Sequence, residues 1–237
     1  MLDRERLESG VEVLRLDRPA QRNAFDSGLL AVMNEALADL ADDATLRVVV
    51  LSSTSPDALS AGADVAEQLD ADAGVARMEA FARMYAQVQE FPVPTIAACV
   101  GHCVGAGAEI AAGCDLRVAA YNLKARWVGA LHGVPVGPAR LAPLVGEAIA
   151  KDLIFTSRVL RAEEALRIGF VRSLHPNDRA EAAAIELAAA LATRPPEGMR
   201  RIKRLFLDLG DGPARVEHEN RELIDFQRHG AGLPRRS

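Results

Sequence analysis

Residues 60–64 read Ser-Ala-Gly-Ala-Asp and residues 101–109 read Gly-His-Cys-Val-Gly-Ala-Gly-Ala-Glu, and these two stretches are the most informative in the chain. In each stretch, small residues stand where a turn leads into an expected helix. The backbone N–H groups of a first helical turn have no partner inside the helix and form its positive end, and small residues let a ligand oxygen approach them. Two such ends facing one point would form an oxyanion hole, and Glu109 could carry a proton beside it. The pair therefore predicts chemistry on a carbonyl group.

Length and composition set the broad class of the protein. A chain of 237 residues can bury a large core, and 49% apolar with only 4% aromatic residues predicts a core of Ala, Val, Leu and Ile, as in helices packed on a sheet. The net charge of −5 argues against a nucleic-acid surface, which would carry a basic excess. The charged start of the chain lacks the apolar core of a signal peptide, and no apolar run reaches the ~20 residues that span a bilayer. We therefore expect a cytoplasmic protein with neither a nucleic-acid nor a membrane partner.

The three cysteines, Cys99, Cys103 and Cys114, lie in Ala-rich apolar surroundings. We expect them to be small core residues in a reducing compartment. A zinc site that uses Cys99, His102 and Cys103 is an alternative, but it lacks the paired spacing of structural zinc motifs. No metal site is therefore predicted.

Strand and helix patterns alternate along the first two thirds of the chain, which indicates an α/β architecture. The expected elements are a hairpin over 7–16, a helix that starts at Asp26 or Ser27, strands over 47–51, 95–100 and 115–120, a helix over 73–90, helices near 149–156 and over 161–169, and a short strand at 170–171. After these, helical patterns continue to about residue 228. We therefore divide the chain into an α/β core over 1–175 and a helical region over 176–237.

Four stretches follow one another in an order that is typical of one enzyme family. Residues 18–25 are similar to its "RP…RNA" start, 59–65 to "F-x-A-G-A-D-L", 100–115 to "V-x-G-x-x-x-G-G-G-x-E-L-x-x-x-C-D", and 161–171 to "I-S-A-E-E-A-L-x-x-G-L-V". Together they closely resemble the crotonase superfamily, the enoyl-CoA hydratase/isomerase family. The resemblance implies a spiral core of ββα units and helical C-terminal segments that build trimers, often paired into hexamers.

The resemblance also implies an acyl-CoA thioester as ligand, in fatty acid metabolism, with coenzyme A as part of the substrate and no covalently bound cofactor. It places the two oxyanion donors on the backbone N–H groups of Ala63 and Ala106, and the general acid/base on Glu109. Alanine at 106 in place of the family's glycine keeps the N–H group, provided that its φ is negative. The residues at positions where the family holds coenzyme A are Arg22, Ala24, Ala61, Asp64, Val65 and Gly105.

The chain departs from the family pattern in two places. Hydratases of the family use a second glutamate in a downstream "P-E" motif, and the matching residues 125–133 contain no carboxylate. His132 is the nearest titratable group and is our candidate substitute, because histidine titrates near neutral pH; a hydrogen-bonded core histidine is the alternative. The family's C-terminal Phe and Lys that reach a neighbour's coenzyme A are also missing. We therefore expect a helical region shorter than usual, in which other residues, or none, reach that coenzyme A.

Several residues have an alternative interpretation. Residues 105–107 could form a dinucleotide-binding loop, but Ile110 stands where that pattern needs a third Gly or Ala. Glu109 could be a structural carboxylate that pairs with an arginine. An apolar stripe on the helix over 73–90 is typical of core and could instead line a substrate pocket; it consists of Met78, Phe81, Met84 and Tyr85.

We therefore predict an acyl-CoA enzyme that stabilises a thioester enolate, of the enoyl-CoA hydratase/isomerase type. An acyl-CoA decarboxylase or thioester hydrolase is a second hypothesis, because an oxyanion hole suffices for it with fewer proton carriers. A non-catalytic coenzyme A-binding paralogue is a third, in which the glycine segments persist because they hold the fold together.

Overall fold

Two sheets lie side by side in the computed structural model, which describes residues 1–233; the last four residues of the predicted helical region lie outside the described part. The larger sheet has the strand order β1-β2-β3-β5-β7-β10. Its strands are β1 (Leu2–Arg6), β2 (Val11–Leu16), β3 (Val48–Ser53), β5 (Thr95–Cys99), β7 (Leu116–Ala120) and β10 (Leu174–His175). The smaller sheet consists of β4 (Ala58–Ser60), β6 (His102–Val104), β8 (Lys124–Arg126) and β9 (Leu160–Arg161).

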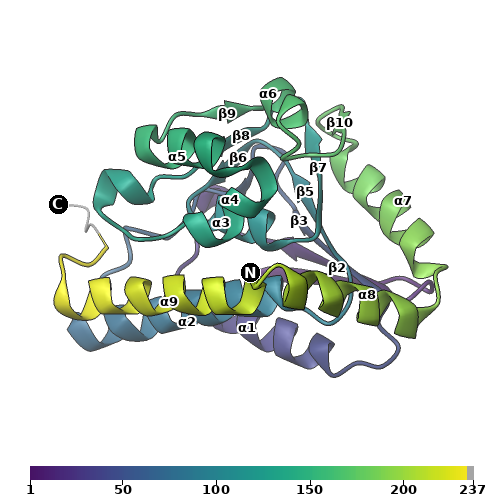
Figure 1. Ribbon diagram of the computed structural model, residues 1–237, viewed down its shortest axis with the longest axis horizontal. Coiled ribbons are helices and arrows are strands. Elements are labelled where there is room, and N and C mark those ends of the chain that lie inside the picture. The colour runs from purple at the N-terminus through teal and green to yellow at the C-terminus, as the bar shows by residue number, and fades with distance from the viewer. Residues whose placement is uncertain (234–237) are drawn as a thin grey trace.

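Helices cover both faces of the larger sheet (Figure 1). The α-helices are α1 (Ser27–Ala41), α2 (Ala71–Gln89), α3 (Ala106–Gly113), α4 (Pro138–Val145), α5 (Glu147–Thr156), α6 (Ala162–Arg167), α7 (Ala180–Ala192), α8 (Pro196–Leu209) and α9 (Gly212–His229). Two short 3₁₀ helices, η1 (Pro19–Gln21) and η2 (Gly129–His132), complete the elements. None of the helices in the described part is long and apolar enough to cross a membrane.

The larger sheet confirms the predicted hairpin and the alternation of strands and helices. β1 and β2 are antiparallel, whereas β2, β3, β5, β7 and β10 pair in parallel. The residues of β5 are all buried, as expected for a parallel strand with helices on both sides. One face packs on Ala184 and Ala188 of α7, and the other packs on the main core beneath α1, α2 and α3.

The predicted start of α1 is confirmed at Asp26. Its carboxylate accepts a hydrogen bond from the Leu29 N–H at 2.8 Å, which satisfies one of the free donors of the first turn. The residues that α1 buries recur at helical spacing, so the helix lies with one face on the core; they include Leu29, Leu30, Met33, Leu37 and Leu40.

Two features differ from the predicted elements. Residues 170–171 form a bend instead of a strand. Their backbone groups are engaged elsewhere, because the Phe170 carbonyl accepts a hydrogen bond from the buried Arg117 guanidinium and the Val171 N–H donates to the Ala165 carbonyl. The strand that pairs with β7 follows at Leu174–His175. A further helix, α4, forms at a segment rich in Pro and Gly, because Pro138 occupies its first turn, where no N–H donor is needed.

The C-terminal helix α9 joins the core. In Figure 1 it runs alongside α2, with α3 and α4 above the two helices. The Asn220 side-chain amide donates to the Ala82 carbonyl of α2 at 2.9 Å, and Val216 and Leu223 are buried. This packing brings residues of α9 next to α3 and α4, close to the glycine segments.

Candidate active site

The two glycine segments meet in the structure. Gly62 has a φ of +100°, and a Cβ added to it would lie 3.0 Å from the Val104 carbonyl oxygen and 3.7 Å from the Ala106 nitrogen. A Cβ on Gly107 would lie 2.6 Å from the Ser60 carbonyl oxygen, so this close approach requires glycine as well. The small residues therefore let the turn after β4 lie directly against the start of α3.

The N–H groups of Ala63 and Ala106 are free within the described part of the chain. Neither donates a hydrogen bond to a backbone or side-chain oxygen there, whereas their neighbours Gly62, Asp64 and Gly105 all do. Ala106 is the first residue of α3, and it is not among the residues with positive φ, which meets the condition set from the sequence. Two unpartnered donors on touching segments are the arrangement that an oxyanion hole requires.

These donors stand at the wall of an apolar cavity of about 280 Å³. The cavity brings together six of the residues singled out from the sequence, which are Ala61, Ala63, Val65, Gly105, Ala106 and His132. Its other walls come from α2, from η2 and the segment after it, and from α9; these residues include Met78, Phe81, Tyr85, Val128, Gly129, Val134, Val136 and Leu223. The apolar stripe of α2 is therefore buried core and cavity wall at once.

The loop over 22–24 lies beside the cavity but does not line it. The Ala61 N–H donates to the Arg22 carbonyl oxygen at 2.9 Å, which places Arg22 and Ala24 next to one cavity wall. Asn23 is buried and has a φ of +54°; its side-chain amide donates to Ser53 Oγ at 2.7 Å. The asparagine of the "RNA" motif therefore holds the loop in its left-handed conformation.

Asp64 also lies outside the cavity wall. Its carboxylate lies 3.4 Å from the Arg18 guanidinium and accepts from the Ala66 N–H at 3.1 Å. The backbone N–H of Asp64 donates to Phe25 at 2.8 Å. These contacts fix the turn that carries the Ala63 donor.

Glu109 is buried on α3 and pairs with an arginine, as the alternative interpretation of this residue foresaw. Its carboxylate accepts from Arg140 Nε at 2.8 Å, and neither side chain is more than 1% exposed. Burial raises the pKa of Glu109 to about 7, against the opposing charge of Arg140 and with a further increase from Glu219. The carboxylate can therefore gain or lose a proton near neutral pH, although it is not among the residues that line the cavity.

Arg140 and Glu219 complete this buried cluster, and sequence reasoning missed both. Arg140 Nη2 donates to Glu219, whose carboxylate also accepts from the Ala139 N–H at 2.8 Å. Arg140 lies on a helix that no clear pattern predicted, and Glu219 lies in a charged stretch that reads as a solvated helix. No local signal links them to Glu109, because the contacts join three separate helices.

Tyr85 connects the cluster with the cavity. Its ring lies 4.5 Å from the Arg140 guanidinium carbon and stacks on Phe81 at a centroid distance of 5.9 Å. Burial and the nearby Glu109 raise the pKa of Tyr85, so the phenol stays neutral. Among the described residues its hydroxyl has no hydrogen-bond partner, and the residue lines the cavity.

His132 lies on η2 at the mouth of the cavity and is exposed. The alternative of a core histidine is therefore wrong, because the 3₁₀ helix carries this residue to the surface. The three cysteines are buried and free, as predicted. No group of three metal-ligating side chains occurs within residues 1–233.

Comparisons with known proteins point to one enzyme family. The family model described as "Enoyl-CoA hydratase/isomerase" matches residues 6–222. A probable enoyl-CoA hydratase 2, mitochondrial, of Arabidopsis thaliana is 31% identical over 83% of the chain and 67% of its own length. A methylglutaconyl-CoA hydratase, mitochondrial, of Rattus norvegicus is 34% identical over 85% of the chain and 66% of its own length.

A solved structure has the same fold over nearly the full length of this chain and of its own chain. The crystal structure of an enoyl-CoA hydratase from Bacillus anthracis has a TM-score of 0.82 and 26% identity, and 98% of each chain is covered. The predicted crotonase-like α/β fold and the helical C-terminal region are thereby confirmed.

The predicted cytoplasmic location is contradicted by the same comparisons, since the two curated relatives described above are named as mitochondrial proteins. That prediction rested on the absence of an apolar signal core. This absence does not distinguish a cytoplasmic from a mitochondrial protein. The order of the motifs, the fold and the match to the family model all indicate the same enzyme family. The chain is an enzyme of the enoyl-CoA hydratase/isomerase family, within the crotonase superfamily.

Proposed function

We propose that the protein binds an acyl-CoA thioester, stabilises its enolate through the N–H groups of Ala63 and Ala106, and acts as an enoyl-CoA hydratase or isomerase with Glu109 as general acid/base. Coenzyme A enters as part of the substrate, and no cofactor is covalently bound. The observation that carries the proposal is the pair of unpartnered N–H donors at the wall of an apolar cavity. Charge that develops on the thioester oxygen would be stabilised there by fixed dipoles in a largely dry site.

The position of Glu109 supports its role in proton transfer. It follows Ala106 by three residues on α3, so the two lie on neighbouring turns of one helix face. Its pKa of about 7 lets the carboxyl group act as acid or base near neutral pH. Among the described residues that line the cavity itself, Tyr85 and His132 carry ionisable side chains, and His132 is a candidate for the second proton carrier.

Two cationic side chains beside the cavity, Arg22 and Lys124, support the binding of the coenzyme A phosphates. Burial, Lys124 and Arg22 lower the pKa of His102, which places both cations near this histidine. Arg22 also lies against Ala61 of the cavity wall. We infer that Arg22 and Lys124 bind phosphate while Ala24, Ala61, Val65 and Gly105 contact the pantetheine.

A second candidate function is favoured by one observation: no Asp or Glu is present among the described residues that line the cavity. Decarboxylation or hydrolysis of an acyl-CoA depends on the oxyanion hole and needs fewer proton carriers than hydration. Malonyl-CoA and methylmalonyl-CoA are the substrates that distinguish this function.

The test is turnover of crotonyl-CoA, followed by the loss of its conjugated enoyl absorbance. We expect turnover by the wild type, a loss of at least about 100-fold in kcat for Glu109→Gln, and no change for Glu222→Gln, an exposed carboxylate on α9. Turnover of malonyl-CoA alone would favour the second function. Tight coenzyme A binding without any turnover would identify a non-catalytic paralogue, and absence of coenzyme A binding would overturn the proposal.

We also propose that the protein forms a homotrimer or a dimer of trimers. α8 carries four large apolar side chains at i, i+3, i+4 and i+7 spacing that are 51–85% exposed, namely Ile202, Leu205, Phe206 and Leu209. An apolar row of this kind on one helix face is typical of a protein–protein contact. Light scattering during size-exclusion chromatography measures the assembly directly.

A further inference from the structure

We propose that Glu219 is a positioning residue for proton transfer: through the guanidinium of Arg140, it fixes the protonation state that Glu109 presents to the substrate. This inference rests on the proposed role of Glu109. Residues 125–133 contain no carboxylate, whereas Glu219 lies on the distant helix α9.

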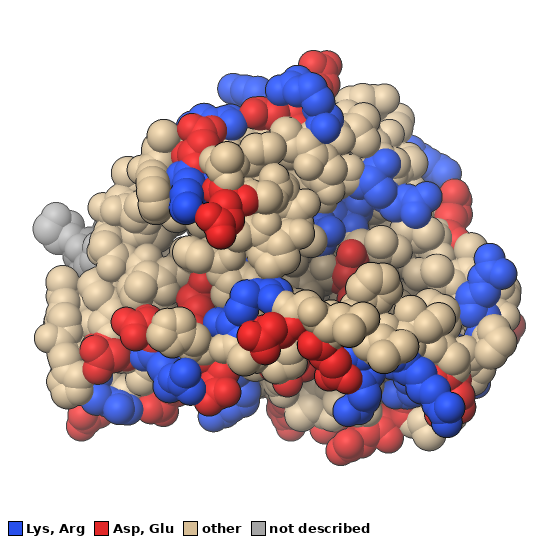
Figure 2. Space-filling model, viewed as in Figure 1, with Lys and Arg blue, Asp and Glu red and all other residues tan. Residues whose placement is uncertain are grey.

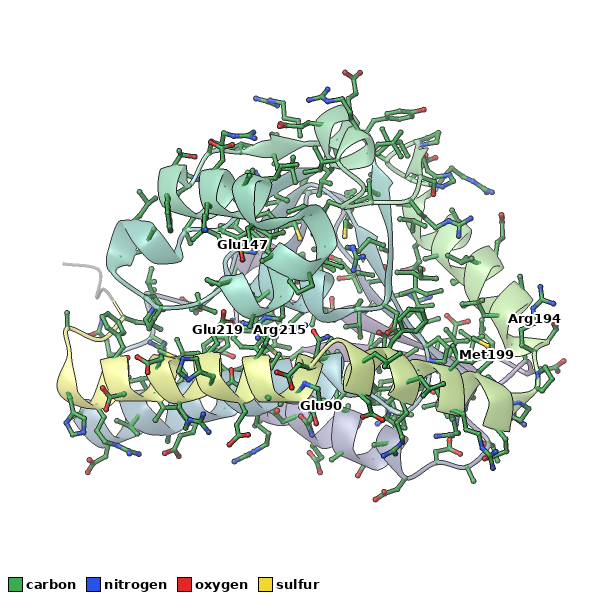
Figure 3. All side chains as sticks on the ribbon, viewed as in Figure 1. Glu90, Glu147, Arg194, Met199, Arg215 and Glu219 are labelled. Carbon is green, nitrogen blue, oxygen red and sulfur yellow. The ribbon has the colours of Figure 1, made fainter. Side chains whose placement is uncertain are left out.

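The geometry that carries this proposal is a carboxylate–guanidinium–carboxylate cluster. Arg140 donates from Nε to Glu109 at 2.8 Å and from Nη2 to Glu219, so one cation bridges two acids on α3 and α9. The Arg140 side chain is 0% exposed, Glu109 is 1% exposed and Glu219 is 8% exposed. In Figure 3, Glu219 stands above α9, on the side that faces α3 and α4.

The charges of this cluster do not cancel when both acids are ionised. Two carboxylates on one guanidinium leave one net negative charge in a buried place, where an uncompensated charge is costly. One added proton makes the cluster neutral. The cluster therefore holds one exchangeable proton, and the charge of Glu219 favours keeping that proton on Glu109.

Few other titratable groups face Glu109 in the part of the chain that the structure describes. Tyr85 on α2 contributes a neutral phenol, and Cys103 on β6 contributes a buried thiol. Arg140 of α4 is the cation in direct contact. Among these elements, Glu219 of α9 is thus the negative charge available to oppose Arg140.

Glu219 is held on its inner side by hydrogen bonds and borders a surface groove on its outer side. The Ala139 N–H donates to its carboxylate at 2.8 Å, while its outer edge lines a surface groove of about 560 Å³. Arg215, His218 and Glu222 of the same helix also line this groove. Figure 2 shows charged side chains over α5 and a row of charged side chains along α9. Glu219 can therefore be substituted at the edge of the core, without opening the cavity that binds substrate.

The experiment compares the pH dependence of kcat for the wild type and Glu219→Gln. Glutamine keeps the side-chain volume, but it removes the charge and one of the two acceptor oxygens, which accept from the Ala139 N–H and from Arg140. One limb of the wild-type pH profile should be absent in Glu109→Gln, which assigns that limb to Glu109. In Glu219→Gln we expect the midpoint of this limb to move to lower pH by about one unit or more. Glu222→Gln, one helical turn away and exposed, is expected to keep the wild-type profile. An unchanged midpoint in Glu219→Gln would overturn the proposal.

A second variant and a second readout separate this inference from the proposed function. Glu219→Asp keeps the charge, so we expect its pH profile of kcat to have the same midpoint as the wild type. A midpoint that moves as far as in Glu219→Gln would count against a charge effect. Infrared difference titration measures the protonated carboxyl band without turnover. We expect a band that titrates near pH 7 in the wild type, disappears in Glu109→Gln and moves to lower pH in Glu219→Gln. If Glu109→Gln keeps full activity, the catalytic role of Glu109 fails, while the infrared shift still decides what Glu219 does.

Discussion

The guanidinium of Arg140 lies 4.5 Å from the centre of the Tyr85 ring, so one aromatic side chain contacts both the substrate cavity and the buried charged cluster behind it. A buried cation on a ring face is stabilising. The cluster and the cavity are therefore neighbours, with Tyr85 in contact with both.

Replacement of Tyr85 should show how much this contact stabilises the fold. Tyr85→Leu removes the ring under Arg140 and should lower the free energy of unfolding by about 2 kcal/mol or more. Tyr85→Phe keeps the ring and should stay within about 1 kcal/mol of the wild type, because the hydroxyl has no partner among the described residues. Urea unfolding at pH 7 measures both, and equal losses in the two variants would argue against a contribution from the ring.

The raised pKa of Glu109 predicts how stability depends on pH. The pKa rises from 4.5 to about 7 on folding, so the folded state favours the protonated form. The stabilising contribution is fully present below about pH 4.5 and is lost as pH rises through 7. Each unit of pKa difference corresponds to about 1.4 kcal/mol. The free energy of unfolding of the wild type, relative to Glu109→Gln, should therefore fall between pH 4.5 and 8. A constant difference between the two curves would contradict this.

Ala106 offers a direct test of the oxyanion donor. Proline is well tolerated at the first position of a helix but has no N–H group, so Ala106→Pro should remove one donor while α3 still forms. We expect kcat to fall about 100- to 1,000-fold, with coenzyme A binding retained in calorimetry. Ala106→Ser keeps the N–H and is the matched control. A proline variant as active as the serine variant would show that this donor takes no part.

The exposed face of α8 predicts the effect of a charge on assembly. Phe206 is 76% exposed, so Phe206→Asp should leave the folded chain intact, as judged by circular dichroism. If α8 forms the contact between chains, the buried charge should shift the protein to a smaller assembly in light scattering. Glu197→Gln, at the start of the same helix and exposed, is the control. An unchanged mass for Phe206→Asp would place the contact elsewhere.

Local patterns in the sequence were enough to predict most of the core. Asp26 and the stripe from Leu29 to Leu40 define α1, and the apolar runs define β3, β5 and β7. The strand expected at 170–171 was misplaced because pairing is set by β7, more than fifty residues earlier, and not by local propensity. α4 was missed because the two prolines within it and the glycines at its two ends hide the helical pattern.

The residues of the site likewise fall into those that the sequence predicts and those that only the structure shows. Ala63 and Ala106 belong to short motifs that the structure brings together, so their proximity followed from the resemblance to the family. Arg140 and Glu219 could not be found from the sequence, since they lie 31 and 110 positions after Glu109 and only tertiary packing joins them. A buried ion cluster has no spacing rule, and the sequence pattern of α9 indicates only a charged helix.

The anchoring of Glu219 on α9 has a consequence for protein engineering. A chimera that joins the first 175 residues to C-terminal helices without a carboxylate at position 219 would remove the negative charge next to Arg140, and with it the electrostatic surroundings of Glu109. If Glu219 acts as we propose, such a graft would change the pH dependence of the reaction even though every residue of the two glycine segments stayed in place. Acid strength in this protein is thus a property of how two distant parts of the chain dock.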